Sequence, residues 1–161
     1  MPHRLLPLLT LLLLLGIAGL VVAAEAPAPK TPAKGDKCPV CGMFVAKYPD
    51  WTAQIAWKDG QTVFFDGVKD LLVCLFDLPR YAPGRSRQDV AAIYVTEYYA
   101  MTPIRAEEAL FVVGSDVYGP MGAELIPFTG RADAEQFAKD HRGKRILPFA
   151  ELTPGLLQTL K

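Results

Sequence analysis

Residues 51–76 read WTAQIAWKDGQTVFFDGVKDLLVCLF, and their pattern predicts the first elements of the fold. Apolar residues occupy every second position from Trp51 to Trp57, which is the alternation of a β-strand. Asp59-Gly60 is typical of a tight hairpin turn, so residues 61–65 are predicted to return as a second strand. Residues 68–76 carry apolar side chains at the spacing i, i+3, i+4 and i+7 of an amphipathic helix. The stretch therefore predicts a β-hairpin followed by a helix.

The order strand, strand, helix, strand is predicted twice along the chain. A strand at 89–99 completes the first unit, and the second has strands at 109–114, 124–128 and 145–149 with a helix at 132–140. Phe65-Asp66-Gly67 and Phe128-Thr129-Gly130 lie 63 positions apart, as do Asp70 and Asp133, and Asp77 and Asp140. We therefore predict an α+β fold of two repeated ββαβ units on one core, with halves of about 38–100 and 101–161. The alternative is that strand-to-helix junctions favour Phe, Gly and Asp without duplication.

The N-terminus has the features of an export signal. A positive start, residues 1–4, precedes an apolar run from Leu5 to Val22 that ends in small residues, which predicts a signal peptide or N-terminal anchor over residues 1–24. No cysteine sits at the end of the run, so no lipid attachment site is predicted. Residues 25–37 are rich in Ala, Pro and Lys and are interpreted as an extended linker, with ordered structure from about Cys38 to residue 161. The domain is expected to work in the periplasm.

Charge gives no indication of a polyanionic partner. The chain has 17 Lys and Arg against 17 Asp and Glu, with a pI of about 6.7. A chain without excess positive charge has no electrostatic footprint for nucleic acid or for anionic lipid. Function is therefore expected in a local site.

Three sulfur atoms within six positions form the first candidate site, Cys38-Pro-Val-Cys41-Gly-Met43. Thiolate and thioether sulfur are the ligands that Cu(I) prefers, and thioethers bind hard ions poorly. If the segment is extended, Cys41 and Met43 project to the same side and can share an ion. The alternatives are a redox CxxC or a structural disulfide, with Met43 filling the core.

The rest of the chain offers few other ligands. Apart from His3 near the N-terminus, the only histidine is His141, so a site built on imidazole is excluded. A structural zinc site needs four Cys or His ligands, and there is one CxxC. Cys74 lies on the predicted helix and is interpreted as a small core residue.

A second sulfur motif is Tyr118-Gly119-Pro120-Met121-Gly122. Glycines and proline predict a tight, exposed turn, where a large flexible apolar side chain is unusual. Met121 is therefore either a third sulfur ligand brought from the second half or a hydrophobic plug beside the strand that follows.

Together these motifs resemble the NosL family of accessory proteins for nitrous oxide reductase maturation. The resemblance covers about residues 36–152 and rests on the two sulfur motifs with the segments between them: Tyr48-Pro49, Phe64-Phe65-Asp66, Val95-Thr96-Glu97-Tyr98 and Pro127-Phe128. It implies two ββαβ units similar to part of organomercurial lyase, and a periplasmic Cu(I) metallochaperone. By position it makes Cys41, Met43 and Met121 copper ligands, with Cys38 as a further candidate.

The resemblance also implies the partners. NosL-like proteins hand Cu(I) to a membrane-associated ABC-type maturation complex and, through it, to apo nitrous oxide reductase. Many relatives are lipoproteins with a cysteine at the signal-peptide junction, whereas this chain has Ala23-Ala24-Glu25. A soluble form or the uncleaved apolar segment would replace lipid attachment here.

The function expected from these observations is copper transfer by ligand exchange, without catalysis. Lys37 and Lys47 flank the motif and are predicted to favour the thiolate of Cys41. The alternatives are a thiol-disulfide oxidoreductase that uses Cys38 and Cys41, a structural zinc domain, and a general copper-handling protein. Against the oxidoreductase, the motif precedes the first strand, so no helix N-terminus is placed to lower a thiol pKa.

Overall fold

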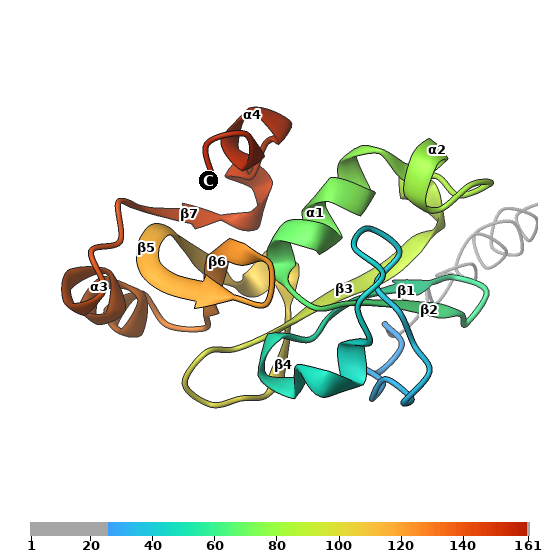
Figure 1. Cartoon of the computed structure of the whole chain (residues 1–161), viewed down its shortest axis with the longest axis horizontal. Coiled ribbons are helices and arrows are strands. Elements are labelled where there is room, and N and C mark those ends of the chain that lie inside the picture. Colours follow the sequence, from blue (N-terminus) through green and yellow to red (C-terminus); the bar gives the residue numbers. More distant parts are fainter. Residues whose placement is uncertain (1–25, 161) are drawn as a thin grey trace, which may run out of the picture.

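The computed structural model of the chain describes residues 26–160 (Figure 1). The signal peptide or anchor predicted over residues 1–24 lies outside the described residues. Within the described part of the chain, no helix is both long and apolar enough to cross a bilayer.

The first half forms a four-stranded antiparallel sheet with the strand order β2-β1-β3-β4. Its strands are β1 (Ala53–Trp57), β2 (Thr62–Phe65), β3 (Val90–Thr96) and β4 (Pro103–Arg105). The predicted hairpin and helix are confirmed, and α1 runs from Val68 to Phe76 as expected. The turn residue Gly60 has a φ of +84°, which glycine adopts without strain. The short β4 and a short helix α2 (Leu78–Tyr81) were not predicted.

The second half forms a three-stranded antiparallel sheet with the order β6-β5-β7. Its elements are β5 (Leu110–Gly119), β6 (Gly122–Phe128), α3 (Arg131–Asp140), β7 (Arg145–Pro148) and α4 (Pro154–Leu157). β5 is longer than predicted because it continues past an irregularity between Val113 and Tyr118 and carries the hairpin to Gly119. Five short 3-10 helices complete the described chain: η1 (Val45–Lys47), η2 (Pro49–Trp51), η3 (Arg87–Asp89), η4 (Ala106–Glu108) and η5 (Phe149–Glu151).

The two halves share one arrangement of their elements. In each, the first strand lies between the second and the one that follows the helix, as β2-β1-β3 and β6-β5-β7. Phe65 and Phe128 end the second strands, and Gly67 and Gly130 precede the helices. The α+β class is confirmed. The duplication of one unit stays a prediction.

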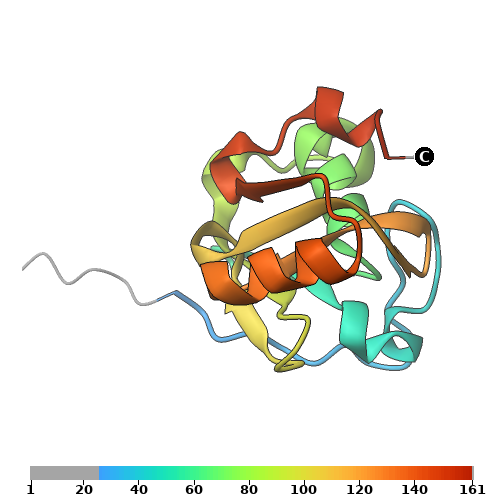
Figure 2. The same cartoon turned by 90° about the vertical axis from the view of Figure 1, so that its left-hand side faces the viewer.

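One apolar core joins the sheets. Ile55 and Phe65 from the first sheet, Phe111 and Leu125 from the second, and Leu71 from α1 are all buried in one cluster. Figure 1 shows α1 where the two sheets meet. The other face of the second sheet is covered by α3, and Figure 2 shows this helix lying across the strands. Burial of these side chains is the main force that holds the halves together.

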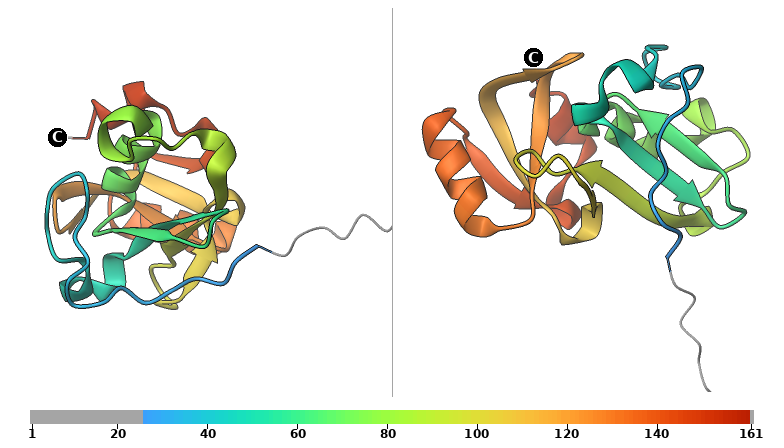
Figure 3. Two further views of the ribbon diagram at one scale, coloured as in Figure 1. Left: turned by 90° about the vertical axis from the view of Figure 1, so that its right-hand side faces the viewer. Right: turned by 90° about the horizontal axis from the view of Figure 1, so that it is seen from below.

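The segment before Cys38 packs on the first sheet, whereas the sequence suggested an extended linker with order beginning near Cys38. The N–H of Lys30 donates to Oε1 of Gln54 at 2.9 Å, and Nε2 of Gln54 donates to the Lys30 carbonyl at 3.0 Å. The Tyr94 hydroxyl donates to the Pro27 carbonyl at 2.7 Å. Figure 3 shows the segment crossing the strands. The side-chain amide of Gln54 pairs with the backbone of Lys30, and Gln54 is buried.

Candidate metal centre

The loop from Cys38 to Met43 is a closed turn. The N–H of Cys38 donates to the Met43 carbonyl at 2.9 Å, and the N–H of Gly42 donates to the Cys38 carbonyl at 2.9 Å. Gly42 has a φ of +79°, which a residue with a side chain would adopt only with strain. The expectation that Cys41 and Met43 lie on one side of an extended segment is therefore wrong, because the chain reverses at Gly42. The turn instead directs both cysteines toward the start of α1.

Two buried carboxylates meet the two thiols. The thiol of Cys41 donates to Oδ1 of Asp66 at 3.2 Å, and that of Cys38 donates to Oδ2 of Asp70 at 3.3 Å. One ligand atom from each of these four residues lies within 4.8 Å of all the others. Asp66 follows β2, and Asp70 lies in the first turn of α1. Oδ2 of Asp66 is buried without a hydrogen-bond partner among the described residues.

The aspartates were not among the predicted site residues. In the sequence they read as polar residues at a helix start, which are common there. The signal that could have found them is their spacing, because residues 66 and 70 are four apart and lie on the side of the helix start that faces the core.

The surroundings of the cysteines favour the protonated thiols. Burial, together with hydrogen bonds to Asp66 and Asp70, raises the pKa of Cys41 to about 11, against the opposing effect of the Met43 N–H. Burial also raises the pKa of Cys38 far above its ordinary range. The prediction that Lys37 and Lys47 favour the thiolate of Cys41 is wrong, because the pKa of Cys41 is raised. Their Nζ atoms lie over the Phe44 ring, 4.8 Å and 5.5 Å from its centroid, and carboxylates are the charges nearest the sulfurs.

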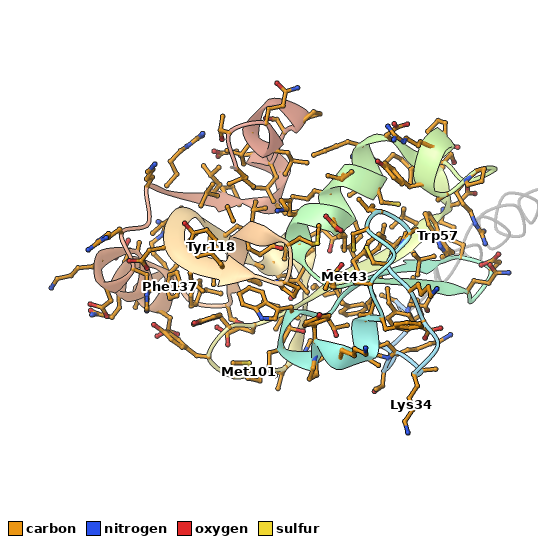
Figure 4. All side chains as sticks on the ribbon, in the orientation of Figure 1. Lys34, Met43, Trp57, Met101, Tyr118 and Phe137 are labelled. Atoms are coloured by element: carbon orange, nitrogen blue, oxygen red, sulfur yellow. The ribbon has the colours of Figure 1, made fainter. Side chains whose placement is uncertain are left out.

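Met43 and Met121 reach the surface from different halves of the fold. Met43 is half-buried in the cysteine loop, and Figure 4 shows it in front of the first sheet. Met121 is 43% exposed at the tip of the β5–β6 hairpin, so it is not a buried hydrophobic plug. Its carbonyl accepts a hydrogen bond from Nζ of Lys69 on α1 at 2.5 Å. Figures 2 and 3 both show the hairpin tip and the cysteine loop on the same side of the molecule. That both methionines are ligands stays a prediction.

The remaining candidate ligands lie elsewhere. Cys74 is fully buried in the apolar core, as predicted. His141 stacks on Phe137, and its Nδ1 lies 3.3 Å from Asp116. Cys38, Cys41, Asp66 and Asp70 form one cluster. Within residues 26–160 it is the single cluster of three or more His, Cys, Asp or Glu residues whose ligand atoms lie close enough to share a metal ion.

The family model of NosL matches residues 29–157. The chain belongs to the NosL family. The resemblance inferred from the sequence motifs is therefore confirmed, and the match covers the segment before Cys38 as well as both halves of the fold.

Two NosL relatives carry the same description, "Copper-binding lipoprotein NosL". The protein from Stutzerimonas stutzeri is 31% identical over 162 residues, which are 94% of this chain and 81% of the relative. The protein from Achromobacter cycloclastes is 29% identical over 131 residues, 74% of this chain and 64% of the relative. Among solved structures, the copper chaperone NosL from Shewanella denitrificans matches with a TM-score of 0.67 at 28% identity, covering 81% of this chain and 98% of that chain. This chain therefore has the same fold as that copper chaperone.

Glu124 on β6 is a further buried carboxyl residue whose side chain reaches the start of α1, and it is expected to make stability depend on pH. Burial raises its pKa from 4.5 to about 8, against the N–H groups of Lys69 and Leu125 and the Lys69 charge. Between about pH 4.5 and 8 the folded state keeps a proton that the unfolded state has lost, so the free energy of unfolding should fall as the pH rises.

Urea unfolding of the wild type and Glu124→Gln across this range measures the effect. The amide holds no titrating proton and keeps an oxygen for both N–H donors, so the variant is the matched control. The difference in free energy, wild type minus variant, should fall by on the order of a few kcal/mol between about pH 4.5 and 8. Parallel curves would contradict the assignment.

Proposed function

We propose that this chain is an exported Cu(I) metallochaperone that delivers copper by ligand exchange and has no catalytic role. The observation that carries the proposal is the cysteine turn. It brings two thiols within 4.8 Å of each other, with Met43 in the same loop and the exposed Met121 on the hairpin tied to α1. Sulfur ligands of this kind select Cu(I) over harder ions. The proposed ligands are Cys41, Met43 and Met121, with Cys38 as a further ligand.

The donors at the site fit a soft monovalent cargo. A thiolate bound to Cu(I) has lost the proton that it donates to a carboxylate in the copper-free state. In this proposal Asp66 and Asp70 orient the two thiols and do not coordinate the metal, because carboxylate oxygen is a hard ligand. Cys38 is 1% exposed, whereas Cys41 is partly exposed. An incoming ligand would therefore reach the metal from the side of Cys41 and Met121, and the ion would pass to it without being released.

The proposed acceptor is a membrane-associated ABC-type maturation complex and, through it, apo nitrous oxide reductase. The support is membership of the NosL family and the copper-binding descriptions of the relatives. Those relatives are described as lipoproteins. This chain has Ala23-Ala24-Glu25 after its apolar run, so periplasmic location through the signal segment is proposed without lipid attachment. A general copper-handling role is the alternative if no such reductase receives the metal.

The thiol chemistry speaks against the oxidoreductase alternative. A nucleophilic cysteine needs a lowered pKa, because the thiolate is the reactive form. Here burial raises the pKa of both Cys38 and Cys41, and each thiol donates to a carboxylate. This pattern suits a pair of thiols that stays protonated until a metal displaces the protons.

Anaerobic transfer tests the function directly. The Cu(I)-loaded chain is mixed with membranes that contain the maturation complex and with apo nitrous oxide reductase, and copper in the re-isolated reductase is measured. We expect the reductase to gain copper from the wild type and not from the Met121→Ala variant. In a parallel disulfide-reduction assay the apo chain should be inactive. Disulfide reductase activity with no copper transfer would favour the alternative enzyme.

A further inference from the structure

The side chain of Glu124 lies in a slot made by two glycines. A Cβ atom at Gly67, which precedes α1, would fall 2.1 Å from Oε2 of Glu124. A Cβ atom at Gly119, at the end of β5, would lie 3.2 Å from Cγ of Glu124 and 3.3 Å from the Trp51 ring. Glu124 is 3% exposed, so its side chain has little room to move. The slot holds β6 against the start of α1.

Lys69 binds this hairpin at two points. Its backbone N–H donates to Oε1 of Glu124 at 2.6 Å, and its Nζ donates to the Met121 carbonyl at 2.5 Å. The N–H of Leu125 also donates to Oε1 of Glu124, at 2.9 Å. A free N–H of the first helical turn is thus satisfied by a carboxyl oxygen of Glu124.

The hairpin tip has few other restraints. Pairing between β5 and β6 is irregular between Val113 and Tyr118, and beyond it only Tyr118 with Ala123 and Gly119 with Gly122 are paired. A two-residue tip on so short a ladder gains little order from its own hydrogen bonds. The contacts with Lys69 and Glu124 are therefore those that fix Met121 relative to the helix.

The same helix start also orients the cysteines. Asp66 lies just before α1 and binds Cys41, and Asp70 in its first turn binds Cys38. The two sulfur-bearing segments come from different halves of the fold. Both are thus positioned by hydrogen bonds to residues at the start of α1.

We propose that Lys69 and Glu124 are positioning residues for copper, which hold the Met121 hairpin where its thioether completes the sulfur site of Cys41 and Met43. This inference rests on the proposed function, and it assigns no metal contact to either residue. Partners that orient a ligand without touching the metal commonly change affinity by about 10–100-fold when they are removed.

A double-mutant cycle on Cu(I) affinity tests the proposal, with a chromophoric Cu(I) chelator as competitor. Lys69→Leu should weaken Cu(I) binding by about 10-fold in the wild type. In a Met121→Ala background the same change should matter by less than about twofold, because Lys69 acts on copper only through Met121 and the two substitutions are then not additive. Lys30→Leu is the matched control, since Nζ of Lys30 donates to the Gly60 carbonyl at 2.7 Å away from the site. It should leave the affinity unchanged.

The Glu124 variants add an independent arm. Glu124→Gln keeps an acceptor for the Lys69 and Leu125 N–H groups and should bind copper as the wild type does, whereas Glu124→Leu should bind more weakly. Thermal unfolding of each variant reports whether it is folded. Equal losses from Lys69→Leu in both backgrounds, or no loss in the wild type, would overturn the proposal and leave the ligand set intact. If Met121→Ala itself has no effect, the proposed ligand set fails and this inference fails with it.

Discussion

The affinity of the chain for Cu(I) is expected to rise by about 100-fold for each unit of pH near neutrality, if one proton leaves each of two thiols on binding. The pKa of Cys41 is raised to about 11 and that of Cys38 is raised further, so both thiols are protonated throughout the neutral range. Metal competes with the two protons, and raising the pH weakens that competition. Affinity therefore increases with pH, with a slope of about two in logarithmic units.

Competition titrations at a series of pH values, with the competitor's own pH dependence subtracted, measure the slope. Cys38→Ser removes one of the two protons and should reduce the slope to about one. This variant also decides whether the deeply buried Cys38 takes part in binding. An affinity that does not change with pH would contradict the thiol chemistry that the site is argued to have.

Removal of Cys41 is expected to have the largest effect of any single substitution. Cys41→Ala should weaken Cu(I) binding by at least about 100-fold, at or beyond the upper end of what orienting residues contribute. Cys41 is the thiol that combines a place in the cluster with partial exposure, so the proposed ligand that an acceptor could also reach is Cys41.

Cys74→Ala is the matched control for this loss. Cys74 is also a free cysteine, but it is buried in the apolar core. Its replacement should lower the free energy of unfolding and change the Cu(I) affinity by no more than about twofold. Similar losses of affinity in the two variants would mean that the loss in Cys41→Ala comes from damage to the fold and not from removal of its sulfur atom.

Local pattern predicted much of the fold because the signals were local. The alternation from Trp51 to Trp57 and the helical spacing over 68–76 belong to single elements, so β1 and α1 followed from the sequence. Gly119-Pro120-Met121-Gly122 specified a turn for the same reason. The burial of Gln54 did not follow from local pattern, because it depends on Lys30, which is far away in the sequence.

Of the residues at the candidate site, the sequence pointed to the cysteines and methionines and not to the aspartates. Cys38 and Cys41 stand out through their spacing, whereas Asp66 and Asp70 gain their role only when the turn at Gly42 reverses the chain toward α1. Aspartates are common near the start of a helix, where they are usually interpreted as capping residues. The raised thiol pKa values follow from burial and from these carboxylates, so the sequence alone pointed to the wrong charges, Lys37 and Lys47.

Sulfur atoms from both halves of the fold are proposed to share one Cu(I) ion. X-ray absorption at the copper edge on selenomethionine-labelled, Cu(I)-loaded protein identifies the atoms bound to copper. Met101→Ala is the matched control for Met121→Ala, since Met101 is 50% exposed and Figure 4 shows it apart from Met43.

We predict sulfur and selenium neighbours without oxygen, and a selenium contribution that decreases in Met121→Ala and is unchanged in Met101→Ala. Copper with oxygen neighbours from the aspartates, or a spectrum that Met121→Ala leaves unaltered, would contradict the account.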